Sequence, residues 1–189
     1  MISIFRSVIC SVSLLVTTVN AATLDGSNVS AALYCCTAPT EPFRIATVAS
    51  STVGNGVEFP QNTFAFSVDG GKWDEGSIDV GNTSIHVDLF ASGTTNAGTF
   101  NGFVFTFTGA PQIIGASVRA GSTFLPTSVV FNQSQVLIDV ASRPYVASSF
   151  LDIDLTLAPV PEAGTTSLLA FGLAALVLWS HRPRSRQDA

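Results

Sequence analysis

Ionisable side chains that share one face of a strand are the first candidates for chemistry in this chain. His86 and Asp88 stand two residues apart in an alternating run, so both side chains point to one side. A hydrolytic triad would also need a nucleophile at the imidazole, and no Gly-x-Ser-x-Gly motif supplies one. Asp152 and Asp154 share a face in the same way, roughly 6.5–7 Å apart, as a pair of glycosidase carboxylates would. We interpret both pairs as solvated polar faces and predict no catalytic residues.

A loop that begins at Asp69 is the second candidate, because it combines carboxylates, turn glycines and a tryptophan. Asp74 and Glu75 add oxygen ligands for calcium, but Lys72 lies among them and the Asp-x-Asn-x-Asp ligand pattern is missing. Trp73 would stack on a sugar ring if it were exposed, and would otherwise pack in a hairpin. We interpret the loop as a hairpin turn with acidic flanks. The alternative is a ligand site at Asp69, Trp73, Asp74 and Glu75. We predict neither a metal nor a cofactor.

Alternation with period two identifies the strands that position these residues. Apolar residues recur at every second position from Ile85 to Leu89 around His86, and from Leu151 to Leu157 around the two aspartates. Further strands are predicted over Phe43 to Val48, Thr63 to Val68, Phe103 to Thr108, Ile113 to Arg119, Ser128 to Phe131 and Gln135 to Val140. Turn residues such as Gly81-Asn82 and Asn132-Gln133 separate them. Eight or nine short strands with polar outer faces predict an all-β fold, an antiparallel β-sandwich.

Residues 1–21 have the composition of a secretory signal peptide. Arg6 supplies the positive start, an apolar stretch follows, and small residues end it. Cleavage is predicted after Ala21, with Ala22 as the second choice. The exported domain then spans residues 22–158, which is long enough for one domain with its own core.

Two adjacent cysteines, Cys35 and Cys36, remain once Cys10 is assigned to the signal peptide. An exported protein meets an oxidising compartment, but neighbouring cysteines close only a small ring, and strand alternation would turn them to opposite faces. We interpret them as small apolar residues. A vicinal disulfide and bonds to another chain are the alternatives.

The last thirty residues combine a short polar motif, an apolar segment and a basic tail. The motif, Val160-Pro161-Glu162-Ala163, leads into 17 uncharged residues from Ala163 to Trp179, at the short end of what crosses a bilayer as a helix. The tail over 180–189 contains Arg182, Arg184 and Arg186, and basic flanks stay on the cytoplasmic side. We therefore expect export of the domain, with transfer stopped by a transmembrane helix over 163–179.

Residues 159–189 resemble the PEP-CTERM protein-sorting signal, which envelope proteins of exopolysaccharide-producing bacteria carry. That signal consists of Val-Pro-Glu-Pro, one transmembrane helix and an Arg-rich end, and Ala163 stands here in place of the second proline. The resemblance implies processing by signal peptidase and by an exosortase-like protease, and delivery to the cell envelope or extracellular matrix. Three segments also resemble a β-domain of such proteins that has no assigned catalytic activity: Gly54 to Phe59, Thr99 to Phe105 and Phe150 to Leu155.

We therefore expect a non-enzymatic exported protein with a structural or adhesive role in an exopolysaccharide setting. A carbohydrate- or calcium-binding lectin-like module is the alternative, and a secreted hydrolase is the third hypothesis. Residues 22–158 contain four basic residues against eleven acidic ones, a net charge near −7. That charge argues against nucleic acid or an anionic lipid surface as a partner.

Overall fold

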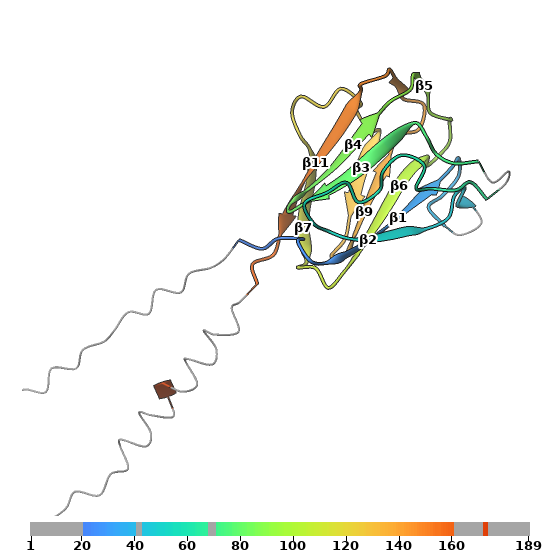
Figure 1. Ribbon diagram of the computed structural model, residues 1–189. Coiled ribbons are helices and arrows are strands. Elements are labelled where there is room, and N and C mark those ends of the chain that lie inside the picture. Colours follow the sequence, from blue (N-terminus) through green and yellow to red (C-terminus); the bar gives the residue numbers. More distant parts are fainter. Residues whose placement is uncertain (1–20, 41–42, 68–70, 161–171, 174–189) are drawn as a thin grey trace, which may run out of the picture. The chain divides into compact units, whose positions relative to one another are not determined.

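The computed structural model describes residues 21–40, 43–67, 71–160 and 172–173 and is built from β-strands (Figure 1). One antiparallel sheet has the order β2-β1-β6-β9-β8, with strands β1 (Asn28–Tyr34), β2 (Ala49–Thr52), β6 (Gly102–Thr108), β8 (Ser128–Phe131) and β9 (Gln135–Asp139). A second has the order β3-β4-β11-β7, with strands β3 (Gly76–Gly81), β4 (Ser84–Leu89), β7 (Ile113–Val118) and β11 (Phe150–Leu157). A short sheet pairs β5 (Gly93–Thr94) with β10 (Pro144–Tyr145). The predicted all-β antiparallel fold is confirmed.

Contacts divide the chain into a compact unit, Ala21–Pro159, and a second unit formed by residues 1–20 and 160–189. All of the strands belong to the first unit. The predicted signal peptide and the predicted transmembrane helix over 163–179 lie outside the described residues, apart from Ala21, Gly172 and Leu173. Within the described part of the chain, no helix has the length and hydropathy of a membrane span. Both targeting segments therefore stay predictions.

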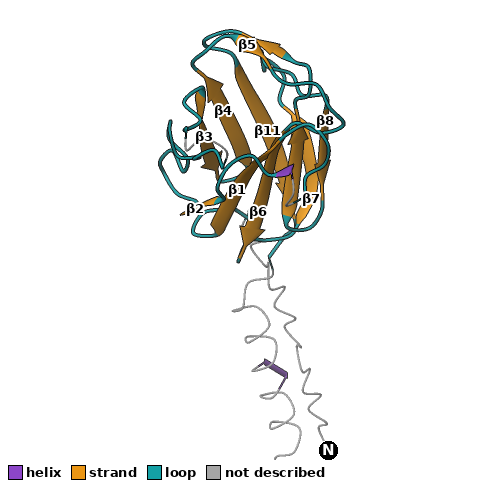
Figure 2. Cartoon of the chain, turned by 90° about the vertical axis from the view of Figure 1, so that its right-hand side faces the viewer, coloured by secondary structure: helices purple, strands orange, loops and turns teal. Residues whose placement is uncertain are grey.

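The two main sheets form a sandwich-like arrangement around one hydrophobic core (Figures 1 and 2). Side chains alternate along each strand, so β6 turns Phe103, Phe105 and Phe107 inward, as predicted. The apolar positions of β4 and of β11 up to Leu155 face the same core and are buried. Each fully buried Val, Leu, Ile or Phe side chain contributes roughly 1.5–3 kcal/mol relative to exposure, and this burial holds the sheets together.

A chain of aromatic rings crosses the core and ties loop residues to β6. Phe59 and Phe64 have ring centroids 5.6 Å apart, and Phe64 and Trp73 lie 5.8 Å apart with their planes at 65°. Trp73 meets Phe103 at 5.8 Å and 69°, and Phe103 lies 6.3 Å from Phe105. Edge-to-face pairs of this kind add roughly 0.5–1.5 kcal/mol beyond their buried area. The loop before β3 is therefore anchored through Trp73.

Two predicted turns are confirmed as strand connections. Gly81 pairs with Ser84, so β3 and β4 form a hairpin that turns at Asn82 and Thr83. Between β8 and β9, Oδ1 of Asn132 accepts hydrogen bonds from the backbone N–H groups of Ser134 and Gln135, both at 2.9 Å. This side chain replaces a backbone acceptor in the turn, which is the usual role of Asn at such positions.

Two of the predicted strands are wrong. Between residues 43 and 48 the chain makes only isolated bridges, Tyr34 with Arg44 and Ala46 with Phe66. Between 63 and 67 it likewise makes only bridges, and Val68 lies outside the described residues. Both segments have strand-like composition, but no neighbouring strand runs beside them over several residues. Lateral pairing, which a single sequence does not reveal, decides whether such a segment becomes a strand.

Five strands, β1, β2, β3, β5 and β10, were not predicted. Along β1, Ala32 and Tyr34 are buried on the outer face as well as Ala31 and Leu33 on the inner face. The outer pair packs with Phe100 in a small second apolar cluster. Of the other four, β2 consists of Ala, Ser and Thr only, β3 begins and ends in glycine, and β5 and β10 are two residues long.

The interpretation of Cys35 and Cys36 as unbonded residues is wrong, because the structure joins them in a vicinal disulfide. The argument from strand alternation does not hold at this place. Strand β1 ends at Tyr34, and Cys36 has a φ of 84°, in the left-handed region. Beyond the strand, the chain turns and brings the two side chains to one side.

Replacement of Ile153 by Ala is expected to destabilise the domain by about 2–5 kcal/mol, because this side chain is fully buried at the centre of β11. The matched control is Ile114→Ala, since Ile114 is 54% exposed and should cost less than about 1 kcal/mol. Urea denaturation followed by circular dichroism measures both. Equal losses for the two variants would contradict the described core.

The disulfide predicts that neither Cys35 nor Cys36 reacts with iodoacetamide in the unreduced protein, even after denaturation. After reduction, both residues should be alkylated. Peptide mass mapping before and after reduction measures this, with Cys10 as a reference for any precursor that retains residues 1–21. Labelling of Cys35 or Cys36 without reduction would contradict the bond.

Candidate functional site

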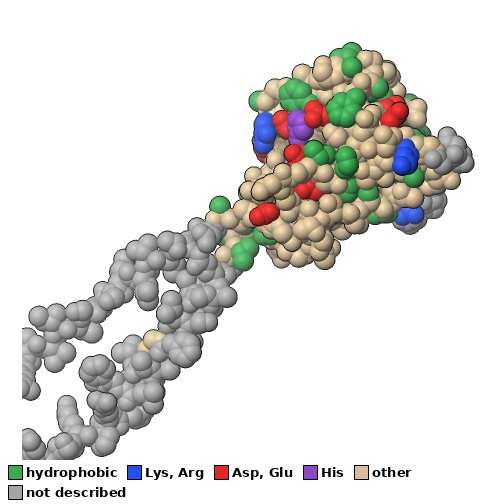
Figure 3. All heavy atoms as spheres, viewed as in Figure 1, with side chains coloured by type: hydrophobic (Ala, Val, Ile, Leu, Met, Phe, Trp, Pro, Cys, Tyr) green, Lys and Arg blue, Asp and Glu red, His purple; other side chains and the backbone are tan. Residues whose placement is uncertain are grey.

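A row of charged side chains crosses the outer face of the second sheet. Strand register places His86 of β4 between Asp79 of β3 and Asp152 of β11. The imidazole Nδ1 lies 2.7 Å from Oδ1 of Asp152, and Nε2 lies 3.1 Å from Oδ1 of Asp88. In the space-filling view, a histidine is seen among acidic side chains with a basic one beside them (Figure 3). The structure therefore brings the two predicted polar pairs into one network.

Arg119, directly after β7, completes this network. Its Nε donates to Oδ1 of Asp154 at 2.9 Å, and a second guanidinium nitrogen contacts the same oxygen. Its Nη1 also lies 3.7 Å from Oδ2 of Asp152. Both aspartates therefore have a cationic partner, which differs from a glycosidase pair in which one carboxyl must stay protonated as the acid.

Both ring nitrogens of His86 are directed at carboxylates, and these contacts favour the protonated imidazole. Burial lowers the pKa of His86, but the hydrogen bond to Asp152 and the charges of Asp88 and Asp152 outweigh it, so the pKa is raised. A triad histidine instead offers one unprotonated nitrogen to a serine hydroxyl. The arrangement around His86 suits an imidazolium that bridges two carboxylates.

Asp79, at the β3 end of the row, has a raised pKa. Burial is the main cause, and the charge of the neighbouring Glu58 is the next. Glu58 is itself held by the backbone, because its two oxygens accept hydrogen bonds from the N–H groups of Gly54 at 2.9 Å and Val80 at 2.7 Å. Glu58 therefore fastens a loop to β3, which is a structural role.

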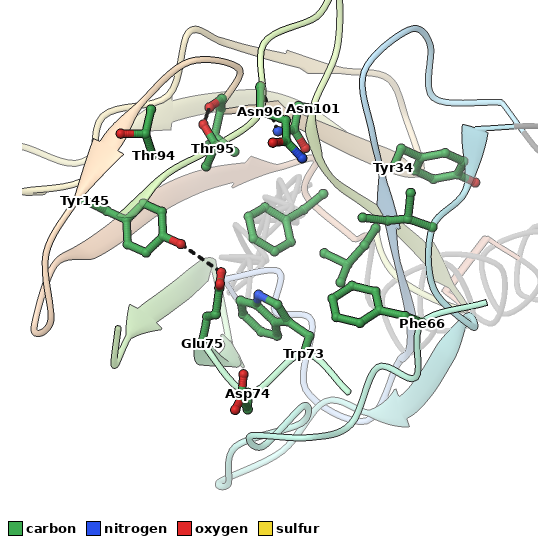
Figure 4. Close-up of a pocket in the computed structure, with 15 residues that line it drawn as sticks. Tyr34, Phe66, Trp73, Asp74, Glu75, Thr94, Thr95, Asn96, Asn101 and Tyr145 are labelled. Carbon is green, nitrogen blue, oxygen red and sulfur yellow. Dashed lines mark hydrogen bonds between the residues drawn. The ribbon is translucent and has the colours of Figure 1, made fainter. Parts of the chain in front are cut away.

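A cavity of about 330 Å³ lies where β1, β6 and β9 meet the loops before β3 and around β5 (Figure 4). Its apolar wall comes from the core and its polar rim from loops. The residues that line it are Leu33, Tyr34, Ile45, Phe66, Trp73, Asp74, Glu75, Thr94, Thr95, Asn96, Asn101, Gly102, Phe103, Val140 and Tyr145. Strand directions put the cavity at the end of the compact unit opposite to Ala21 and Pro159.

The loop that the sequence singled out contributes three residues to this cavity. Trp73 is 7% exposed and packs in the core. Its indole therefore forms part of the cavity wall and is not an exposed surface outside the cavity on which a sugar ring could stack. Asp74 is exposed, and Glu75 is half-buried. Asp69 lies outside the described residues, while the bridge between Ala65 and Lys72 agrees with the hairpin interpretation.

One hydrogen bond joins two sides of the cavity. The hydroxyl of Tyr145 donates to Oε2 of Glu75 at 2.9 Å (Figure 4). Burial, and then this bond, raises the pKa of Tyr145 to about 12, so the phenol stays protonated near neutral pH. Phe124 packs edge-to-face on the Tyr145 ring at 5.8 Å. Tyr145 is therefore a positioned donor.

Sequence reasoning missed Tyr145, Asn96, Asn101 and the two threonines of the rim. They stand 19 or more residues from Glu75 in the chain, in segments with no alternation that would have singled them out. Only the pairing of β5 with β10 brings Tyr145 to the cavity.

Within the described ranges, no group of three or more His, Cys, Asp or Glu side chains is placed to hold a metal ion. Comparison of the chain with protein-family models, with curated proteins and with solved structures found no significant match.

The raised pKa of His86 predicts that the imidazolium stabilises the fold below pH about 6.5, and that this contribution is lost as pH rises through the folded pKa. His86→Gln should remove that part of the pH dependence. NMR titration of the ring protons measures the pKa, with His181 as the second histidine of the chain. A pKa of His86 below about 6.5 would contradict the network.

Proposed function

We propose that this protein is a non-enzymatic, exported protein of the cell envelope or extracellular matrix, released or transferred through a C-terminal PEP-CTERM-like sorting signal. The observation that carries the proposal is the place of the motif. Strand β11 ends at Leu157 and the compact unit ends at Pro159, so the motif 160–163 begins where the domain stops. Val160 is 49% exposed. A protease would meet a segment outside the sheets.

The residues around the motif favour an extended substrate. Pro161 disfavours helical backbone at Val160, within the motif, whereas Pro159 restricts only Ala158, outside it. An exosortase-like protease would cut near 160–163 after the apolar segment 163–179 had stopped transfer, with Arg182, Arg184 and Arg186 on the cytoplasmic side. Signal peptidase would have removed the N-terminus after Ala21 or Ala22.

The domain itself supports a structural or adhesive role. Its second sheet presents a polar, acidic outer face, and the ion pairs of His86 and Arg119 occupy the side chains that a hydrolase would need. The sandwich-like fold also suits the β-domain that such sorted proteins carry. An exopolysaccharide matrix would be the surrounding in which the domain acts.

Intact-mass analysis of the protein recovered from its native host, with mapping of the C-terminal peptide, tests the sorting proposal. The expected mature protein ends near Glu162 and lacks the apolar segment and the arginines. A mature protein that ends at Ala189 would contradict processing.

Substitutions in the motif sharpen this test. Ala163→Pro restores the family pattern and should raise the processed fraction, whereas Pro161→Ala should lower it several-fold. Pro159→Ala, a proline just outside the motif, is the matched control and should leave processing unchanged. If Pro159→Ala and Pro161→Ala had equal effects, the motif would not be what the protease reads.

A further inference from the structure

We propose that the cavity beside Trp73 and Tyr145 is a binding site for a saccharide residue that carries no acidic group. This inference goes beyond the proposed sorting and does not depend on it. At about 330 Å³ the cavity lies at the small end of the range of small-molecule sites, roughly 300–1,000 Å³. It therefore suits one or two sugar rings better than a large ligand.

Two glycines leave room for the aromatic side chains that form the walls of the cavity. A Cβ on Gly76 would clash with the carbonyl oxygen of Asp88 and lie 3.0 Å from Cη2 of Trp73, so glycine lets the indole take its place. A Cβ on Gly93 would lie 2.8 Å from the hydroxyl of Tyr145. Close packing thus requires glycine beside both walls, and a preformed site loses little entropy when a ligand enters.

The lining offers both donors and acceptors. The hydroxyl proton of Tyr145 is donated to Oε2 of Glu75, so toward a ligand the Tyr145 oxygen and Oε1 of Glu75 are acceptors. The amide groups of Asn96 and Asn101 and the hydroxyl of Thr94 add further donors and acceptors on the rim (Figure 4). Sugar hydroxyls both donate and accept, so they match such a mixed rim.

Apolar and charged groups narrow the ligand class further. Four aromatic side chains, Phe66, Trp73, Phe103 and Tyr145, provide apolar surface for the C–H face of a sugar ring. The lining contains two carboxylates, Asp74 and Glu75, and no Lys, Arg or His among the described residues. An acidic sugar would be repelled by both carboxylates, and this repulsion gives the site its selectivity.

The site is also placed where a ligand can reach it. Both ends of the compact unit, Ala21 and Pro159, leave from the opposite end of the domain. Neither end of the compact unit therefore lies at the cavity.

Tryptophan fluorescence of the full chain tests the proposal. The chain has two tryptophans, so Trp179→Phe leaves Trp73 as the reporter in the cavity wall. The protein is kept in a detergent without a sugar headgroup. The probes are neutral disaccharides of glucose, galactose, mannose and N-acetylglucosamine, together with digalacturonate of the same linkage as the digalactose, and choline as a small organic cation. At least one neutral disaccharide should give a saturable change at millimolar concentration, and digalacturonate should bind at least about tenfold more weakly than digalactose.

Variants assign the binding to this cavity. Tyr145→Phe should weaken the affinity roughly tenfold, because it removes the hydroxyl of the hydrogen bond that positions the rim. Glu75→Gln should weaken it by a similar factor, because a neutral amide oxygen replaces the charged acceptor of that bond. Asp74→Asn, at an exposed position, tests the charge without altering the core. The matched control, Asp25→Asn, alters an exposed carboxylate near the domain's first residue and should bind like the wild type.

Several results would overturn the proposal. They are no response to any neutral sugar, digalacturonate binding as tightly as digalactose, choline binding in place of sugars, or wild-type affinity in folded Glu75→Gln and Tyr145→Phe variants. Thermal unfolding of each variant shows whether it is folded. Failure here would leave the processed C-terminus, and hence the sorting proposal, untouched.

Discussion

Burial of one indole ring determines how the strand core and the loops of this domain fit together. Trp73 contacts Phe64 on one side and Phe103 of β6 on the other, and is 7% exposed. Because Asp74 and Glu75 follow it directly, the same burial decides where these carboxylates stand. Removal of a large buried aromatic costs roughly 3–5 kcal/mol, which is a substantial part of the stability of a domain. The core therefore supplies both the cohesion of the sheets and one wall of the cavity.

The charged row on the second sheet is a consequence of strand register. A shift of β4 by one residue would turn His86 into the core and Val87 to solvent, so the apolar pattern fixes which polar residues meet. His86 and Arg119 remain partly exposed, and partly exposed ion pairs contribute only about 0–1 kcal/mol each. Their main effect is to neutralise neighbouring carboxylates on a face that would otherwise be crowded with negative charge. Strand register and charge neutralisation together account for the meeting of the candidate catalytic residues in one network.

The cavity and the C-terminal motif occupy different parts of the chain, so the proposed ligand binding and the proposed sorting use different residues. The motif 160–163 follows the end of the compact unit at Pro159, and it is there that we propose a processing enzyme acts. The cavity lies at the other end of the domain, with glycine, aromatic and amide groups in a fixed arrangement. The cavity and the last residue of the compact unit therefore lie at opposite ends of that unit.

By itself, the sequence determined the fold class, most strands of the second sheet and the polar faces of β4 and β11, because alternation with period two is a local property. It also predicts the two targeting segments, because their signals depend on composition and order along the chain. Only the tertiary structure decided that residues 43–48 and 63–67 form bridges and not strands, since pairing needs a neighbour. Likewise, the vicinal disulfide depended on a turn after β1 that composition does not show. The cavity, too, was decided by tertiary structure, because Trp73, Asn101 and Tyr145 are brought together by packing between sheets, which no spacing along the chain encodes.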